Sequence, residues 1–481
     1  MSLQYHSQSV AKLYFFGAIL LFIIQIAFGL IIGLQYIIGD FLFPDLPFNI
    51  GRMVHTNALI FWIFLGFMGT AYYIVPEEAD TELATPWLAY VIFWLFFLTA
   101  AATLAGYVLM PYAQLAAITK NDLLPTMGRE FLEQPTIVKI SIAALLSAFC
   151  LQIWTTIVKG RKTGINVAIF IGLASTTLLF FIAFYNPTNL ILDKFYRWWI
   201  IHLWFEGTWE LVLTAILAFV LLKTTGTSRE YIEKWLYLIA AMIFITGIIG
   251  IGHHYYWIGA PIYWHWWGSV FAALESIPLF MMIVFTFNTI YHRHHDHPNQ
   301  VSMLWLIGTV IMTFIGGIWG FIHTLPAINY YVHGTQITSA YTHLALYGSY
   351  AIINLAMISY SMPILRGYEA NSERAQILEM WSFWLMTIAM SFIAIFVTIA
   401  GVLQVYMQRY TDTPESFMAV QERIVFFYWL RELAGIIFVI GILTYIISFF
   451  IGRNRHHDHH DNHYHNQVHN EHAHHEHNQH Y

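Results

Sequence analysis

The chain has 481 residues, of which 58% are hydrophobic, 18% aromatic and only 10% charged, and its formal net charge is −6. A soluble globular domain carries about 25% charged residues, so this composition excludes one. It predicts a polytopic membrane protein surrounded by the lipid bilayer. The net charge is negative, so we expect no nucleic-acid partner.

Twelve apolar runs reach about 20 residues, the length that crosses a hydrocarbon core about 30 Å thick. In lipid every backbone polar group must be bonded within the structure, and the runs do not alternate as barrel strands do. We therefore expect an all-α fold, a bundle of twelve transmembrane helices within residues 1–452. The expected spans cover residues 13–37, 54–75, 86–110, 136–158, 165–185, 197–222, 235–256, 264–290, 303–324, 336–363, 378–405 and 426–450.

The first span follows the polar segment MSLQYHSQSV, and no small-residue cleavage site follows it. We therefore expect a retained membrane helix and not a removable signal peptide. Loops on the side of the N-terminus hold slightly more Lys and Arg, above all KGRKTG after the fourth span, which favours a cytoplasmic location for that side. Both termini would then be cytoplasmic.

The only cysteine, Cys150, lies in the middle of the fourth span. This excludes a disulfide framework, a cysteine-rich metal site and a CxxCH motif for covalent haem attachment. Any haem in this chain must be held by side-chain ligands alone.

Ionisable side chains within membrane spans are costly, and each is a functional candidate. Several histidines and glutamates lie within the expected spans or at their edges, too many to be explained by packing alone. In chain order they are His55, His202, Glu206, Glu210, His253, His254, His265, Glu275, His323 and His343.

The densest group is in the sixth and seventh spans. HLWFEGTWELV places His202 and Glu206 four residues apart on one helix face, with Glu210 one turn further along. A hydrogen-bonded polar stripe is one interpretation, and two ligands of one metal ion is the other. GIGHHYYWIG adds the adjacent imidazoles of His253 and His254. Three imidazoles and one carboxylate suit a first-row metal, and the hard oxygen ligand favours iron.

His55 and His343 are isolated imidazoles on aromatic-rich spans far apart in the sequence. Either one alone is typical of a hydrogen-bonded core histidine. As a pair facing one another, they would suit the two axial positions of a haem.

Residues 453–481 differ from the rest of the chain, because they are rich in His, Asp, Asn and Glu and nearly free of apolar residues. Such a segment cannot form a core, so we expect a disordered cytoplasmic tail. It is either a solvated low-complexity segment or a surface site for a transition metal. The shorter YHRHHDHPNQ after the eighth span has the same two interpretations.

Six motifs in this order resemble the catalytic (cytochrome b) subunit of the cytochrome-c-dependent respiratory nitric oxide reductases, in the haem–copper oxidase superfamily. They are RMVHTN, GREFLEQPT, HLWFEGTWE, GIGHHYYWIG, FIHTLP and HGTQIT, and the resemblance covers residues 10 to 452. Oxidases of this superfamily typically carry His-Pro-Glu-Val-Tyr, and Glu206 occupies the place of that tyrosine. The resemblance therefore implies a reductase with non-haem iron rather than an oxygen reductase with copper.

The resemblance also implies a role for each matching residue. His202, Glu206, His253 and His254 would bind the non-haem iron, and His55 and His343 would bind a low-spin haem b. The carboxylates of Glu210 and Glu275 would act with Glu206 in catalysis by relaying protons. Glu130 would bind a calcium ion that bridges haem propionates, Arg52 would pair with a propionate, and Glu133 would lie on the proton route from the outer face.

The implied reaction reduces two NO to N2O and water with two electrons and two protons, one NO being held at each of two irons. The implied partners are a membrane-anchored c-type cytochrome subunit and a soluble donor, a cytochrome or a cupredoxin, in a bacterial inner membrane during denitrification. A transporter or channel would not need this histidine set, and a haem–copper oxygen reductase would need copper.

The tenth span departs from the family. Nitric oxide reductases have a His-x-His pair there, and residues two apart on a helix point about 200° apart, so one ligand serves each haem. Here the stretch reads AYTHLALYG, with His343 second and Tyr341 first. Three outcomes follow: Tyr341 binds a high-spin haem b as phenolate, that haem is bound without a strong protein ligand, or the haem is absent or the site inactive. Because Tyr341 replaces the usual proximal histidine, and a phenolate would lower the potential of the haem, altered chemistry such as NO dismutation or an inactive haem protein is the alternative to NO reduction.

Overall fold

The computed structural model describes residues 3–110, 130–293 and 297–451. In these ranges the chain is helical and contains no strand, which confirms the all-α prediction. The helices are α1 (Ala11–Ile37), α2 (Phe48–Ala79), α3 (Pro86–Leu109), α5 (Thr136–Lys159), α6 (Gly164–Phe180), α7 (Leu190–Leu203), α8 (Trp209–Thr225), α9 (Arg229–Gly250), α10 (Tyr263–Tyr291), α11 (Gln300–Thr324), α12 (Pro326–Val332), α13 (Gln336–Leu346), α14 (Ile352–Leu365), α15 (Glu373–Val405) and α16 (Phe417–Ser448).

Twelve helical segments of the described chain are long and apolar enough to cross a membrane, as predicted. Several extend beyond the apolar run that predicted them; the second span, for example, is Phe48–Ala79 instead of 54–75. A helix can continue past the hydrocarbon core because the polar residues at its ends still form the helical backbone hydrogen bonds. The histidine-rich tail from residue 453 and part of YHRHHDHPNQ, residues 294–296, lie outside the described residues.

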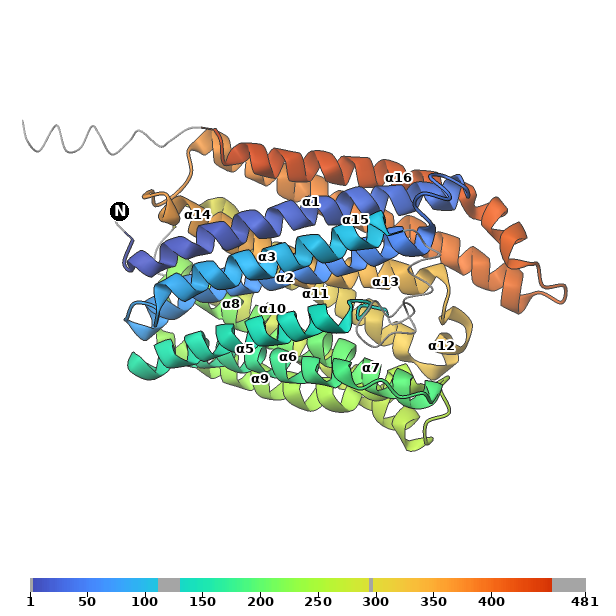
Figure 1. The fold of residues 1–481 in the computed structure, drawn as a ribbon, viewed down its shortest axis with the longest axis horizontal. Helices are drawn as coiled ribbons and strands as arrows, with labels where there is room; N and C mark the ends of the chain where they lie inside the picture. The colour runs from blue at the N-terminus through green and yellow to red at the C-terminus, as the bar shows by residue number, and fades with distance from the viewer. Residues whose placement is uncertain (1–2, 111–129, 294–296, 452–481) are drawn as a thin grey trace, which may run out of the picture.

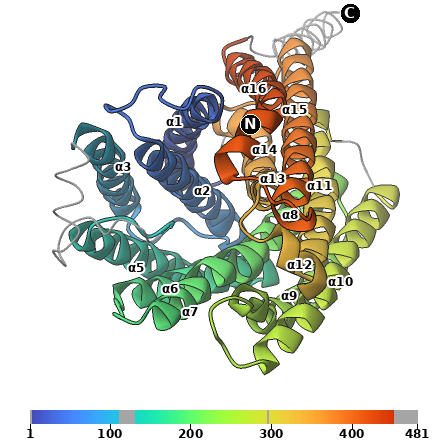
Figure 2. The ribbon, with the colours of Figure 1, turned by 90° about the vertical axis from the view of Figure 1, so that its right-hand side faces the viewer.

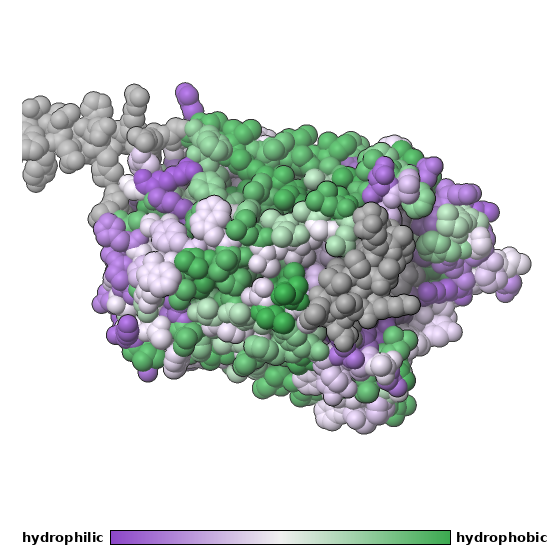
Figure 3. Space-filling model, in the orientation of Figure 1, coloured by the Kyte–Doolittle hydropathy of each residue, from purple (hydrophilic) through white to green (hydrophobic). Residues whose placement is uncertain are grey.

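The long helices run side by side along one axis (Figure 1). α1 begins and α16 ends at the same end of the bundle, which we call the terminal end. The loop before α2, the start of α7 and the short helix α12 lie at the other end, which we call the pocket end (Figures 1 and 2). A largely apolar band separates the more polar ends in the space-filling view (Figure 3), as expected for a bundle that faces lipid.

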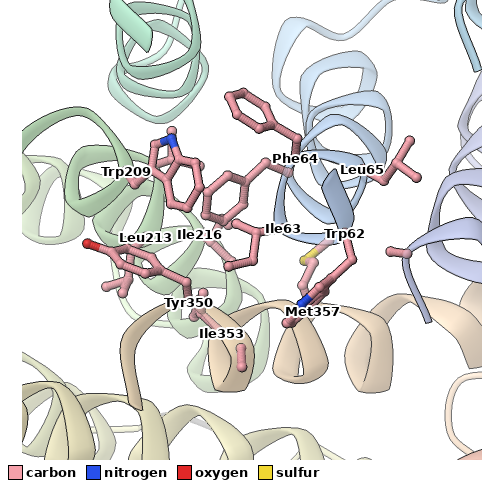
Figure 4. Packing of buried hydrophobic residues seen from close by; sticks show 14 of the residues in the cluster. Trp62, Ile63, Phe64, Leu65, Trp209, Leu213, Ile216, Tyr350, Ile353 and Met357 are labelled. Carbon is pink, nitrogen blue, oxygen red and sulfur yellow. The ribbon is translucent and has the colours of Figure 1, made fainter. Parts of the chain in front are cut away.

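Three segments form the inside of the bundle. In the most apolar stretch of each span, the share of buried residues is 100% for α2, 94% for Gln336–Leu365 and 83% for Leu190–Thr225. No other span of the described chain exceeds 56%. Figure 4 shows their contact: Phe64 of α2 packs edge-on against Trp209 of α8, and Trp209 packs edge-on against Tyr350 beside α14. Five of the ten histidines and glutamates singled out above, His55, His202, Glu206, Glu210 and His343, lie on these three inner segments.

Two of the inner segments contain a π-helical turn. Trp204–Thr208 (η3) joins α7 to α8, and Tyr347–Ala351 (η5) joins α13 to α14. In the first turn Glu206 leaves helical geometry, with φ −100° and ψ 26°. π turns within α-helices occur frequently at functional sites. The regular face expected for His202, Glu206 and Glu210 is therefore interrupted at its central residue.

Candidate metal centre and haem site

Four side chains from α7, the turn after it and the end of α9 converge on one point. His202, Glu206, His253 and His254 each offer one ligand atom, and these four atoms all lie within 4.8 Å of one another. Ligand atoms on one first-row metal ion are about 3 to 4 Å apart, because each bond is about 2.1 Å long. Small side-chain shifts would bring all four atoms onto a single ion, so the residues fit a mononuclear metal.

His202 is oriented for ligation by a hydrogen bond on its other nitrogen. Its Nε2 donates to the carbonyl oxygen of Gly247 at 2.7 Å, which leaves Nδ1 without a proton and facing the cluster. Metal-binding histidines are typically fixed in this way by a carbonyl or carboxylate behind the ring. Gly247 is required for the close approach, since a Cβ there would lie 2.0 Å from the carbonyl oxygen of Glu206.

The adjacent pair His253 and His254 lies where α9 stops. The α-helix ends at Gly250, and Ile251–Tyr255 form a 3-10 turn (η4). The rings of His253 and His254 lie 5.1 and 5.0 Å from the ring of His202, centre to centre. The Nε2 of His254 is 3.2 Å from the Nδ1 of His202. Both imidazoles therefore face the same point, as the sequence interpretation required.

The Glu206 carboxylate connects two parts of the site. Its Oε2 lies 3.3 Å from His202 Nδ1 and 4.0 Å from His253 Nε2. Its Oε1 accepts a hydrogen bond from the hydroxyl of Tyr341 at 3.2 Å. Tyr341 thus stands on the opposite side of this carboxylate from the imidazoles.

The Tyr341 ring is enclosed by α11. The ring of His323 lies nearly parallel to it, with centres 6.0 Å apart, and the Nε2 of His323 is 3.2 Å from the Thr338 hydroxyl. A Cβ on Gly320 would approach the Tyr341 ring to 2.6 Å, so glycine leaves the room that the phenol occupies. His265, in contrast, packs edge-on against Tyr256 at the pocket end of α10. It is not one of the four described residues that converge on the metal position.

Two further carboxyl groups are buried in the bundle, one on an inner segment and one on α10. Glu210 on α8 is 6% exposed and Glu275 on α10 is 9% exposed. Glu210 Oε2 and Glu275 Oε1 find no hydrogen-bond partner among the described residues. An unbonded buried carboxyl oxygen is costly, and such groups are retained in membrane proteins mainly for ion or proton transfer.

His55 of α2 and His343 of α13 face each other across the bundle interior. Their ring centres are 6.3 Å apart and the ring planes differ by 31°. Each ring donates from Nδ1 to a carbonyl oxygen at 2.8 Å, that of Gln25 for His55 and that of Ser339 for His343. Two metal–nitrogen bonds of about 2 Å and two ring radii of about 1 Å add to roughly 6 Å. The pair therefore fits the two axial positions of one haem iron.

A pocket of about 500 Å³ opens at the pocket end, and it is lined by Asn49, Arg52, Met53, Glu130, Phe131, Glu133, Lys194, Arg197, Trp198 and Ile201. Arg52 forms an ion pair with Glu130. Burial raises the pKa of the Glu133 carboxyl to about 7, although a 3.0 Å hydrogen bond from Asn57 opposes this shift. The cations in the lining suit the carboxylates of haem propionates.

The sequence interpretation missed the aromatic residue next to the metal cluster. The Trp198 indole lies flat on the His254 ring, with centres 3.9 Å apart and planes inclined by 12°. Trp198 is four residues before His202 on α7, and Lys194 of the pocket is four residues before Trp198. The signal was therefore present, because the four-residue spacing that selected His202 and Glu206 also extends towards the N-terminus.

With this geometry in place, the comparisons define the class of protein. The chain matches the family of cytochrome c and quinol oxidase polypeptide I over residues 9–437, so it belongs to this family of haem–copper oxidase subunits and is an oxidoreductase. It is also 54% identical over 451 residues to a nitric oxide reductase subunit of Stutzerimonas stutzeri, a match that covers 93% of this chain and 95% of the relative. The resemblance expected from the six motifs is confirmed.

More distant relatives agree with the fold. A cytochrome c oxidase subunit 1 homolog of Agrobacterium tumefaciens (strain T37) is 24% identical over 459 residues, covering 86% of this chain and 78% of the relative. A solved structure of a haem–copper terminal oxidase dimer superposes with a TM-score of 0.73 over 93% of this chain and 85% of that one, at 14% identity. This last similarity concerns the fold alone.

Proposed function

We propose that the chain is the catalytic subunit of a respiratory nitric oxide reductase, which reduces two NO to N2O and water with electrons from a cytochrome c. The observation that carries this proposal is the metal cluster, in which Glu206 stands beside three imidazoles. A carboxylate among the ligands favours iron, whereas copper prefers nitrogen and sulfur ligands. The 54% identity to the nitric oxide reductase subunit of Stutzerimonas stutzeri supports the same activity.

The cofactors would be held by residues of the three inner segments and the end of α9. His55 and His343 would bind the low-spin haem b, and the cluster of His202, Glu206, His253 and His254 would bind the non-haem iron. Tyr341 would bind the high-spin haem b after its hydroxyl moves away from Glu206, because two oxygens 3.2 Å apart leave no room for a haem between them. Arg52 would pair with a haem propionate, and Glu130 would bind calcium.

The calcium site is incomplete in the chain itself. Calcium takes about six to eight oxygen ligands, and Glu130, which is paired with Arg52, supplies one carboxylate. Haem propionates would supply further ligands.

When bound, the high-spin haem and the non-haem iron would supply two neighbouring Lewis-acidic metals that hold two NO molecules close together. The protein's own contribution is orientation and proton supply. Gly247 fixes the tautomer of His202, and Glu206 spans the distance between the imidazoles and Tyr341. Glu210 and Glu275 lie buried with an unbonded oxygen each and would hold the two protons that the product water needs.

Protons would reach these carboxyls from the pocket end, which we assign to the outer face of a bacterial inner membrane, with both termini cytoplasmic. Glu133 lines the pocket, and its pKa of about 7 lets it take up and release a proton near neutral pH. Electrons would arrive through a membrane-anchored c-type cytochrome subunit, which a soluble cytochrome or cupredoxin would reduce.

A second candidate function follows from Tyr341. Its hydroxyl bonds to Glu206 where relatives of the resembled family carry an imidazole, so a variant of the reaction, such as NO dismutation, or an inactive haem protein is the alternative. A haem–copper oxygen reductase has less support, because Glu206 stands where those enzymes carry a tyrosine.

Metal and haem analysis tests the proposal directly. We expect the complex, purified from membranes with its cytochrome subunit, to contain iron in excess of haem iron and little copper, and to consume NO with formation of N2O. Elemental analysis combined with a haem assay measures the first expectation, and gas chromatography measures the second. Stoichiometric copper would end the proposal in favour of an oxygen reductase, and two haems with NO consumption but no N2O would favour the variant chemistry.

Replacing His55 by alanine should abolish the low-spin haem spectrum, because one of the two facing imidazoles would be missing. Electron transfer to the non-haem iron should stop with it, while the iron itself remains bound. Absorption spectra of the reduced protein and its iron content measure both effects. His265→Ala is the matched control, since that imidazole faces Tyr256 instead of the cofactor sites. An unchanged bis-imidazole spectrum would remove His55 from the haem ligands.

A further inference from the structure

Trp198 stands between the pocket and the metal cluster. It is one of the residues that line the 500 Å³ pocket, whereas His254 is not among them. The same indole lies flat on the His254 imidazole at a centre-to-centre distance of 3.9 Å, with the two planes inclined by 12°. A single side chain therefore forms a wall of the pocket and a cover over a metal ligand.

The flat contact restricts the one torsion that decides where His254 points. The second side-chain torsion of histidine is broad and nearly two-fold, so the ring plane must be fixed by its surroundings. Here the indole holds the ring plane while His254 Nε2 lies 3.2 Å from His202 Nδ1. The ring of His202 is held by a hydrogen bond to the carbonyl oxygen of Gly247. The ring of His254 is held instead by its flat contact with the Trp198 indole.

The helix register places the indole there. Lys194, Trp198, His202 and Glu206 follow one another at four-residue intervals along α7 and into η3. The stripe leads from the pocket to the cluster, because Lys194 and Trp198 line the pocket and His202 and Glu206 belong to the cluster. Trp198 is the residue of this stripe that both lines the pocket and contacts His254.

We propose that Trp198 is a positioning residue for the metal centre: its indole fixes the ring plane of His254 and shields the metal from water in the pocket. This inference rests on the proposed function, since it requires non-haem iron at the cluster. Residues behind metal ligands control the orientation of the ligands and the access of solvent. For His202 that residue is a hydrogen-bonded carbonyl, and for His254 we assign the same role to the Trp198 indole.

The test compares three substitutions of Trp198 in the purified complex. Trp198→Leu and Trp198→Met remove the aromatic face, while Trp198→Phe keeps a flat ring. The probe is a strong iron chelator, and the measured quantity is the half-time for release of non-haem iron. We expect release to be about tenfold faster or more in the leucine and methionine variants and near wild type in the phenylalanine variant. The Mössbauer signature of the iron should change in the first two variants only.

Trp199→Leu is the matched control, because Trp199 is the next residue of α7, packs towards Phe195 and is absent from the pocket lining. A wild-type rate of iron release in this control would show that losing a tryptophan from α7 does not by itself speed the release of iron. The low-spin haem spectrum reports whether each variant is assembled, and if the leucine variant does not assemble, the methionine and phenylalanine variants decide.

The outcomes separate the two proposals. If the wild-type complex holds non-haem iron and the methionine variant releases it at the wild-type rate with an unchanged Mössbauer spectrum, the role of Trp198 is overturned and the function stands. If the wild-type complex contains no non-haem iron, the proposed function fails first and the inference falls with it.

Discussion

Replacing Glu206 by alanine should remove the non-haem iron while the low-spin haem remains bound. One oxygen of this carboxylate faces His202 and His253, and Glu206 is the one carboxylate in the cluster of four residues that could hold the metal. The three imidazoles alone would hold a hard divalent iron weakly. Loss of a hydrogen-bonding partner behind a metal ligand already lowers metal affinity or activity by about 10- to 100-fold. Loss of the ligand itself should therefore lower the rate of NO reduction by roughly 100-fold or more.

Iron content, the haem spectrum and NO consumption, measured on one preparation, check this expectation. Glu379→Gln is the matched control for cofactor content: Glu379 is a fully buried carboxylate on α15, bonded by Ser359 at 3.3 Å and outside the cluster of His202, Glu206, His253 and His254, so both cofactors should stay bound. Full NO reduction in Glu206→Ala would contradict the ligand assignment. Loss of the low-spin haem together with the iron would show that the substitution unfolds the bundle and acts through stability.

The fold was largely predictable because lipid imposes a length. A run of about 20 apolar residues can satisfy its backbone only as a helix, so each run marked one span whatever its neighbours were. The prediction could not say which spans are inner. α2 and Gln336–Leu365 are buried almost all round, yet they are no more apolar than the outer spans, most of which are more apolar, so a strongly apolar run does not mark an inner span.

The metal cluster was partly predictable, for a local reason. The four-residue spacing of His202 and Glu206 brings their side chains together within one helix, and the structure places the two groups 3.3 Å apart. The π turn at Glu206 was not predictable, because it depends on Gly247 of another helix, whose missing Cβ admits the Glu206 carbonyl. Contacts between spans, such as Trp198 on His254, require the tertiary arrangement even where the spacing gives a hint.

Tyr341 is the residue on which the exact chemistry depends. Its hydroxyl reaches the Glu206 oxygen that faces away from His202 and His253, so the phenol and the imidazoles lie on opposite sides of one carboxylate. His343, two residues later, points instead at His55, as expected for residues about 200° apart on a helix. In the proposed function the tenth span would direct one side chain to each haem, and the one directed to the high-spin haem would be a phenol.

Replacing Tyr341 by phenylalanine should therefore remove the ligand of the high-spin haem while leaving the low-spin haem and the non-haem iron in place. We expect the haem-to-protein ratio to fall from two towards one, the iron–phenolate bands in the resonance Raman spectrum to disappear, and NO reduction to fall by roughly 100-fold, because two NO molecules are no longer held together. Tyr341→His should restore a haem with an imidazole ligand. Tyr347→Phe is the control, since the Tyr347 hydroxyl bonds to Thr387 at 3.1 Å and not to Glu206.

The same three variants separate the remaining alternatives. A wild-type protein with two haems, no phenolate bands and an unaltered spectrum in Tyr341→Phe would mean that another side chain or none binds the high-spin haem. One haem in the wild type, rising to two in Tyr341→His, would mean that the phenol prevents haem binding by keeping its hydrogen bond to Glu206. A phenolate is a stronger electron donor than imidazole and lowers the reduction potential of its haem. If phenolate ligation holds, the wild-type high-spin haem should therefore be reduced at a lower potential than that of Tyr341→His, which a spectroelectrochemical titration of both proteins measures.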